Sequence, residues 1–279
     1  MTYDSAQLAQ AYQNACLEEI EALKPGNVHI YADGHDMVVQ DFIRSAEVSS
    51  KTIALPNLSL GVRIYHSVDA TWQTVGCNTN LGIVLLCAPL VQAALMQNKY
   101  SLTDNLTQVL ATTTIEDAQK VFEAIQLVKP AGLGHSDQYD VRDQAHCTLL
   151  QAMEVAERRD MVARQYSNGF DQVLHEALPC YQQALLAWER PAWAATAMYL
   201  YWLSHYPDSH VQRKYGEEAA QQLQDEAIVH AEAYAKHANP KQYLPQLMQF
   251  DQDLKARGIN PGTSADLTVA TLLLHRIII

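Results

Sequence analysis

Hydrophobic residues recur every three or four positions along most of the chain, which is the spacing of one face of an amphipathic helix. In the first predicted helix Ala11, Ala15 and Ile20 lie on such a face, and a Lys-Pro-Gly segment at 24–26 ends the pattern. Alternating β-branched residues between turn dipeptides, which would indicate strands, are almost absent. The pattern therefore predicts an all-α protein with about ten helices.

The composition supports a single helical domain over residues 1–279. Hydrophobic residues make up 48% of the chain, which is enough to bury a sizeable core. The 11 glycines are a smaller share than the ~7% of average usage, as expected for a helical protein. We find no internal repeat, low-complexity tract or flexible linker that would divide the chain.

Charge and cysteine usage exclude several classes of protein. With 31 acidic against 19 basic side chains, the net charge of -12 argues against a nucleic-acid partner, which would require a basic face. The absence of an apolar run of ~18 residues and of a secretory signal predicts a cytoplasmic protein without a membrane partner. The five cysteines form no C-x-x-C pair and are expected to be reduced.

The glycines indicate where a ligand could bind. Glycine lets the backbone approach a ligand closely, and helix N-termini present N–H groups to anionic oxygens. Seven glycines lie in or beside short polar stretches between predicted helices: Gly26, Gly76, Gly82, Gly132, Gly134, Gly216 and Gly262.

Two of these junctions carry most of the polar side chains. In the first, Lys24 and Asn27 flank Gly26 and suit a phosphate-facing loop, although a helix C-cap with a left-handed Gly26 explains the same residues. In the second, residues 78–80 have the sequence Asn-Thr-Asn between two glycines. Capping the following helix needs one of these side chains, which leaves the others for a ligand.

Three later junctions resemble these two. Asp140 follows a Gly-Leu-Gly segment, Asp208 precedes Arg213, and an Asn-Pro-Gly segment at 260–262 opens the last predicted helix. Taken alone, Asp208, Ser209 or Ser264 is a plain N-cap. Ser264 or Thr263 would cap the last helix, and Asp266 would then lie in its first turn.

The ordered set of junctions resembles the triphosphoribosyl-dephospho-CoA synthase family, over residues 10–275. Members of that family have a helical domain with a Lys-Pro-Gly motif, a downstream Asp-Phe and Ser-Ala, and an Asn-Thr stretch closed by Gly. The matching segments here are Lys24-Pro25-Gly26, Asp41-Phe42, Ser45-Ala46, Asn78-Thr79-Asn80-Leu81-Gly82, residues 208–216 and residues 260–267.

The chain departs from the family pattern at one point. Enzymes that make the prosthetic group of citrate lyase and malonate decarboxylase typically carry a His and a basic residue after Asn-Thr, where this chain has Asn80 and Leu81. A charge at a phosphate contact is thereby lost. The chain looks like a member of a sister branch, some of whose members accompany pterin-dependent C1 metabolism, so the acceptor could be a different cofactor precursor.

The resemblance implies transfer of the triphosphoribosyl group of ATP to a ribose 2′-hydroxyl of dephospho-CoA, with release of adenine and with Mg²⁺ bound to the triphosphate. The catalytic residues would be Asp266, as base or as stabiliser of oxocarbenium-like charge, and Asn78. Asp140 and Asp208 would hold Mg²⁺. Substrate contacts would come from Lys24, Gly26, Asn27, Thr79, Asn80, Gly82, Arg213, Asn260, Gly262 and Ser264.

Other readings of the sequence stay open. The scaffold could serve a nucleosidase, or a phosphohydrolase that uses the dyad His35-Asp36 as a metal site. A noncatalytic helical protein would need the polar junctions only as caps. The Trp-rich stretch from Trp188 to Trp202 fits either a central pair of core helices or the interface of a homodimer.

Overall fold

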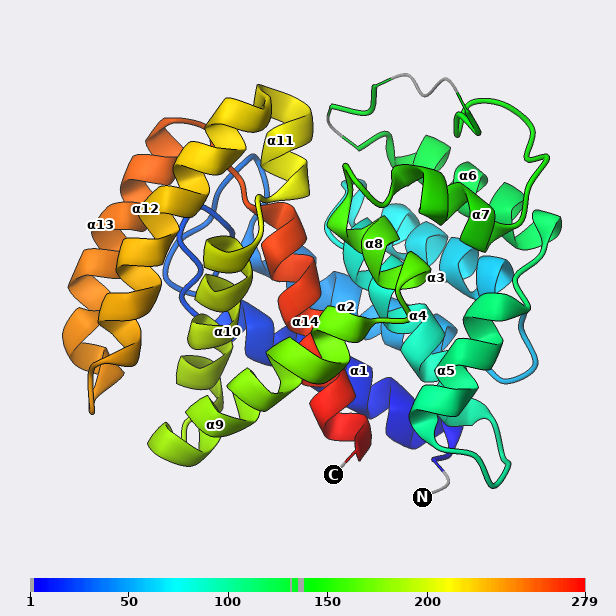
Figure 1. The fold of residues 1–279 in the computed structure, drawn as a ribbon, viewed down its shortest axis with the longest axis horizontal. Coiled ribbons are helices and arrows are strands. Elements are labelled where there is room, and N and C mark those ends of the chain that lie inside the picture. The colour runs from blue at the N-terminus through cyan, green and yellow to red at the C-terminus, as the bar shows by residue number, and fades with distance from the viewer. Residues whose placement is uncertain (1–2, 131, 135–137, 279) are drawn as a thin grey trace.

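The computed structural model describes residues 3–130, 132–134 and 138–278, and these residues form helices connected by short loops (Figure 1). Two isolated β-bridges lie in the loop before Val38, and the described part of the chain contains no strand. A π-helical segment spans Gln172–Ala177 and a 3₁₀ turn spans Pro240–Tyr243. The α-helices are α1 (Ser5–Glu21), α2 (Val39–Ile53), α3 (Leu60–Val75), α4 (Leu81–Leu95), α5 (Leu102–Ala111), α6 (Ile115–Val128), α7 (Leu149–Ala156), α8 (Met161–Ser167), α9 (Leu178–Trp188), α10 (Pro191–His205), α11 (Ser209–Tyr215), α12 (Glu217–Ala235), α13 (Leu244–Ala256) and α14 (Gly262–Ile278).

The all-α prediction is confirmed, but the predicted number of about ten helices is wrong, because the described residues form fourteen. The excess comes from short helices with their own caps. Thr148, Asp160 and Asp208 each accept backbone N–H groups at the start of α7, α8 and α11, which have eight, seven and seven residues. A periodic pattern read over 11–18 residues cannot separate such helices.

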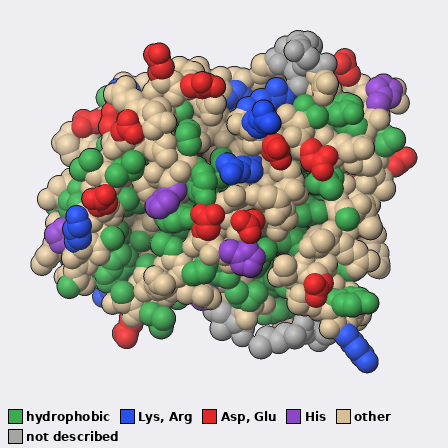
Figure 2. Space-filling view, in the orientation of Figure 1, with side chains coloured by type: hydrophobic (Ala, Val, Ile, Leu, Met, Phe, Trp, Pro, Cys, Tyr) green, Lys and Arg blue, Asp and Glu red, His purple; other side chains and the backbone are tan. Residues whose placement is uncertain are grey.

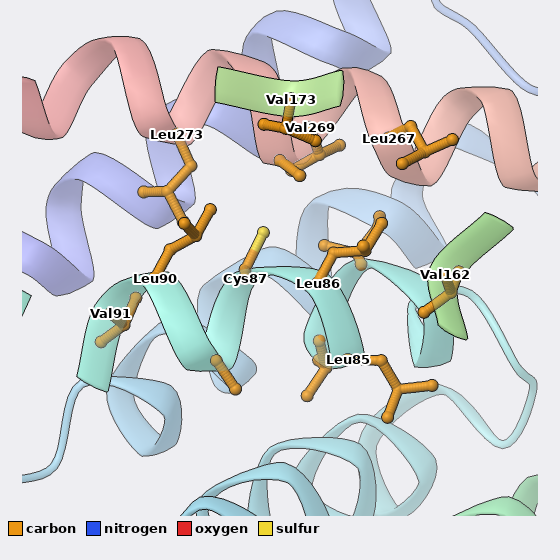
Figure 3. Close-up of a cluster of buried hydrophobic side chains, with 14 of the residues drawn as sticks. Leu85, Leu86, Cys87, Leu90, Val91, Val162, Val173, Leu267, Val269 and Leu273 are labelled. Atoms are coloured by element: carbon orange, nitrogen blue, oxygen red, sulfur yellow. The ribbon is translucent and has the colours of Figure 1, made fainter. Parts of the chain in front are cut away.

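The centre of the fold is the contact between α4 and α14. α4 carries apolar side chains on all faces and is buried over most of its length, as a helix inside a core should be. Figure 3 shows Leu86 and Leu90 of α4 opposite Val269 and Leu273 of α14. This packing fixes the N-terminal ends of both helices, where the polar junctions lie.

A second apolar cluster lies beside this centre and joins α10 to α11, α12 and α13. In Figure 1 these helices lie on one side of α14, and α3 to α8 lie on the other. Met198 and Trp202 of α10 are almost fully buried, which confirms the core interpretation of the Trp-rich stretch for these side chains. The prediction of a single domain over the whole chain stays a prediction.

No helix in the described ranges combines the length and the apolar character that a bilayer crossing needs.

Candidate active site

The polar junctions meet around one cavity of about 490 Å³. Its wall is formed by the loop after α1, the starts of α4 and α14, parts of α6, α7, α8 and α11, and described residues of the loop between α6 and α7. Ten of the predicted site residues line it: Asn27, Asn78, Thr79, Asn80, Gly82, Asp140, Arg213, Asn260, Gly262 and Asp266. Segments more than 200 positions apart in the sequence therefore share one site.

Two residues of the cavity wall, Gly82 of α4 and Asp266 of α14, pack directly against each other. A Cβ atom built on Gly82 would lie 2.0 Å from Oδ2 and 2.6 Å from Cγ of Asp266, so only glycine fits there. The absence of a side chain at the second residue of α4 lets the carboxyl group of α14 lie directly against it. This contact explains why the Asn-Thr stretch is closed by a glycine.

Asp266 has an unusual electrostatic environment. Burial, followed by the negative charges of Glu19, Asp208 and Asp160, raises the pKa of Asp266 well above its usual range, and the positive charge of Lys24 opposes this shift. No hydrogen bond or ion pair joins its carboxyl group to another described residue. The group lines the cavity and is available to a ligand.

The Lys-Pro-Gly loop and the Asn-Pro-Gly loop pack against each other. Gly26 has φ +82°, and a Cβ atom there would lie 2.9 Å from Pro261. The side chain of Asn27 donates to Asn260 at 2.8 Å, so the two loops also share a hydrogen bond at the cavity wall. Gly26 itself lies behind that wall, where its N–H donates to Asp251 at 2.9 Å.

Lys24 does not line the cavity. Its ammonium group is fully buried, is paired with Glu19 and donates to Asn27 at 3.1 Å. Burial lowers the pKa of Lys24 and raises the pKa of Glu19, while the attraction between them opposes both shifts. The sequence predicts a direct phosphate contact for Lys24. In the structure Lys24 lies behind the cavity wall and binds two residues that line it, Glu19 and Asn27.

The Asn-Thr-Asn segment is held from behind as well. The side-chain Oδ1 of Asn78 accepts from the N–H of Leu81, the first residue of α4, at 3.2 Å. Thr79 shares a hydrogen bond of 2.6 Å with Ser45 of α2, and Asn80 donates to Thr71 of α3 at 2.9 Å. Although all three side chains line the cavity, each also fixes the start of α4 to a neighbouring element.

Asp208 joins two helix starts and lies behind the cavity wall. Its Oδ1 accepts from the N–H groups of His210 and Val211, and its Oδ2 accepts from the N–H and hydroxyl of Ser264, all within 3.1 Å. The prediction that Ser264 or Thr263 caps the last helix is wrong, because α14 begins at Gly262. The Ser264 N–H takes its acceptor from another helix, and Asp266 lies beyond the first turn.

This geometry favours a structural role for Asp208 over the predicted role in metal binding. We expect Asp208→Asn to lower the free energy of unfolding by about 1.5–3 kcal/mol, because hydrogen bonds to a charged group are lost. Chemical denaturation measures this change, with exposed Asp171→Asn as the control. A variant with unchanged stability but a higher Mg²⁺ requirement would instead assign Asp208 to the metal.

Basic side chains gather where α11 approaches the α7–α8 junction. Arg213 lies 3.4 Å from Asp160, and Arg159 also lines the cavity. Gly132 packs against Arg213, where a Cβ atom would come within 3.1 Å. On the face seen in Figure 2, Lys and Arg side chains lie close to Asp and Glu side chains near the middle of the molecule. These arginines are suited to a polyphosphate.

Comparison with known proteins decides the family. The model of the family CitG, ATP:dephospho-CoA triphosphoribosyl transferase, matches residues 5–278. The chain belongs to this family. The membership confirms the resemblance drawn from the junction motifs.

One curated protein and one solved structure are similar to this chain. A 2-(5″-triphosphoribosyl)-3′-dephosphocoenzyme-A synthase from Pectobacterium atrosepticum is 33% identical over 111 residues, which are 39% of this chain and 34% of the relative. The match thus spans about a third of the length of that curated relative. A crystal structure from Archaeoglobus fulgidus, provisionally named a triphosphoribosyl-dephospho-CoA synthase, has the same fold, with a TM-score of 0.59 and 24% identity over 84% of this chain and 94% of that one.

Several residues that line the cavity were not predicted from the sequence. Glu19 lies inside the first helical pattern, where nothing distinguishes it from a solvent-facing acid. Asp160 and Arg159 lie at a helix start that the periodic pattern did not separate. His210 belongs to a junction that was recognised, but only Asp208 and Arg213 were selected from it. A histidine two positions after that cap was the available signal.

The predicted magnesium ligands do not come together. Asp140 lines the cavity, but both of its oxygens accept from Arg142 at 2.8 Å, whereas Asp208 lies behind the wall. In the parts of the chain that the structure describes, no group of three or more His, Cys, Asp or Glu side chains is arranged to hold a metal. These carboxylates therefore do not fit a metal site built from protein ligands alone.

Proposed function

We propose that this protein transfers the 5-triphosphoribosyl group of ATP to the ribose 2′-hydroxyl of dephospho-CoA and releases adenine. The observation that carries the proposal is the contact between Gly82 and Asp266. It brings two family segments, residues 78–82 and residues 260–267, into one cavity. Membership of the family supplies the reaction. Dephospho-CoA is the first acceptor to test, and a related cofactor precursor is the second.

The cavity lining contains groups that suit both parts of these substrates. Arg159, Arg213 and the asparagines can bind phosphate and ribose oxygens. Apolar side chains of α6, α7 and α8, among them Phe122 and Met153, also line the cavity. Uncharged parts of a nucleotide or of the pantetheine arm can be buried there.

In the proposed reaction the bond from C1′ to N9 of adenine breaks and a bond from C1′ to the acceptor oxygen forms. Positive charge develops on the ribosyl ring as the bond to adenine lengthens. The phosphates of the donor and the carboxylate of Glu19 in the cavity wall are suited to stabilise that charge. Asn78 and Asn27 are suited to orient ribose hydroxyls.

Mg²⁺ in this proposal enters with ATP as part of the substrate. Phosphate oxygens and water can supply most of its octahedral shell, with one or two carboxylates from the protein. Asp140 is the predicted ligand that lines the cavity, and it would have to share its oxygens with Arg142. Bound Mg²⁺ would neutralise the triphosphate inside an acidic protein.

The experiment is incubation with Mg–ATP, with and without dephospho-CoA, followed by chromatography for adenine and an assay for inorganic phosphate. We expect adenine only when an acceptor is present. Adenine without an acceptor would indicate a nucleosidase, and phosphate without adenine would indicate a phosphohydrolase. A noncatalytic protein would give neither product, and would lack the ~2.7 kcal/mol of stabilisation expected from Mg–ATP at 100 times its dissociation constant.

The phosphohydrolase alternative is not favoured by the geometry of its candidate dyad. The ring Nε2 of His35 lies 2.7 Å from the carbonyl oxygen of Gly26, and so His35 supports the loop after α1. Both His35 and Asp36 have positive φ, at 56° and 61°, in a tight turn. Neither residue lines the cavity.

A further inference from the structure

The starts of α11 and α14 bring two titratable side chains, His210 and Asp266, to the wall of the same cavity. Neither the imidazole of His210 nor the carboxyl group of Asp266 is hydrogen-bonded to another residue in the ranges that the structure describes. In a wall where most polar groups are tied to a neighbour, both groups are free to meet a substrate.

Asp208 fixes the relation between these two helix starts. It accepts from the backbone N–H of His210 with one oxygen and from Ser264 with the other. The hydroxyl of Thr263 also accepts from the N–H of His210, at 3.1 Å. The His210 ring lies over Gly262, where a Cβ atom would come within 2.8 Å of Nδ1. The backbones that carry the two groups are therefore rigidly joined.

The surroundings of His210 keep its ring neutral. Burial lowers the pKa of His210 to about 4, and the positive charges of Arg213 and Lys214 on its own helix add to the effect, as does His35 in the loop after α1. The imidazole can accept a proton but does not hold one at neutral pH.

The surroundings of Asp266 act in the opposite direction. Burial and the negative charges of Glu19 on α1, Asp208 before α11 and Asp160 before α8 raise its pKa, against the opposing charge of Lys24. The carboxyl group is thereby held toward its protonated form. Two titratable groups whose environments separate their protonation in this way are a common sign of an acid and a base in one site.

We propose that Asp266 is the general acid that protonates the departing adenine, and that His210 is the general base that takes the proton of the acceptor 2′-hydroxyl. This assignment rests on the proposed function and reverses the role of base predicted for Asp266. The proton balance closes: one proton leaves the hydroxyl for Nε2 or Nδ1 of His210, and one leaves Asp266 for a ring nitrogen of adenine. Exchange with solvent restores both groups for the next turnover.

The test compares ATP with its N7-methylated analogue, whose base leaves as a neutral molecule and needs no acid. With ATP, we expect Asp266→Asn and His210→Gln each to lower kcat by at least about 100-fold, the usual contribution of an acid or a base. With the methylated donor, Asp266→Asn should recover to within tenfold of the unmodified protein, whereas His210→Gln should not. His175→Gln, at an exposed position that does not line the cavity, is the control that keeps full activity.

A second measurement decides the matter if the methylated donor does not bind. In the unmodified protein kcat/KM should rise with pH through a value of about 4, as His210 loses its proton, and fall again at higher pH, as Asp266 ionises. His210→Gln should lose the rising limb and Asp266→Asn the falling limb. The assignment would be overturned if each variant kept the pH dependence of kcat/KM of the unmodified protein. It would also be overturned if Asp266→Asn lowered kcat by the same factor with both donors, or if His210→Gln were fully active. If the unmodified protein releases no adenine, the proposed function fails instead.

Discussion

Replacing Gly82 with alanine is expected to lower adenine release by at least about 100-fold. The added methyl group would lie 2.0 Å from Oδ2 of Asp266, far inside contact distance, and the backbone of α4 is packed too tightly against α14 to move away. The carboxyl group would have to rotate out of its position, and a displacement of about 1 Å at a reacting group can cost a factor of 100 in rate. Steady-state kinetics with Mg–ATP and dephospho-CoA measure the loss.

A matched control is available in the same cavity. Gly134 also lines it, but a Cβ atom at Gly134 would meet no atom of the described residues within 4 Å. We therefore expect Gly134→Ala to keep activity within about twofold. If both variants were equally active, Asp266 would not depend on its contact with Gly82, and the site described above would need a different centre.

Replacing Lys24 with methionine is expected to destabilise the fold by about 3–5 kcal/mol, the usual result of leaving one buried charge without its partner. Lys24 is fully buried, and Glu19 beside it is 3% exposed, so water cannot replace the ammonium group. The loss should appear in the midpoint of chemical denaturation. Activity should fall as well, because Asn27 at the cavity wall loses the donor that orients its carbonyl oxygen.

The double variant Lys24→Met with Glu19→Gln separates charge from packing. Removing both charges should restore a large part of the lost stability, since no isolated buried ion remains. A single Lys24→Met variant as stable as the original protein would show that the pair is neutral in the folded state. The pair would then contribute hydrogen bonding alone.

The sequence was sufficient to predict the helical class, because amphipathic helices such as α2 and α6 carry clear periodic patterns. It was not sufficient to count the helices. Short elements such as α8 and α11 depend on a single capping aspartate and on tertiary packing rather than on a pattern of their own. The capping role of Asp208 was visible, but its second bond, to Ser264 in another helix, was not.

The same distinction applies to the site. The polar junctions at Asn78, Asn260 and Asp266 could be found because the few glycines of the chain lie beside them, between apolar helices, and all three residues line the cavity. Lys24 was misplaced because its partner Glu19 lies in a helix where acidic residues are ordinary. Contacts of this kind, between a helix interior and a loop, follow only from the packing.

Mass spectrometry of the acceptor after incubation with Mg–ATP tests the central claim most directly. We expect dephospho-CoA to gain one triphosphoribosyl group for each adenine released, and the Gly82→Ala variant to form this product at least about 100-fold more slowly. Adenine release with an unmodified acceptor, or transfer of phosphate alone, would contradict the account, because the cavity would then not hold donor and acceptor together.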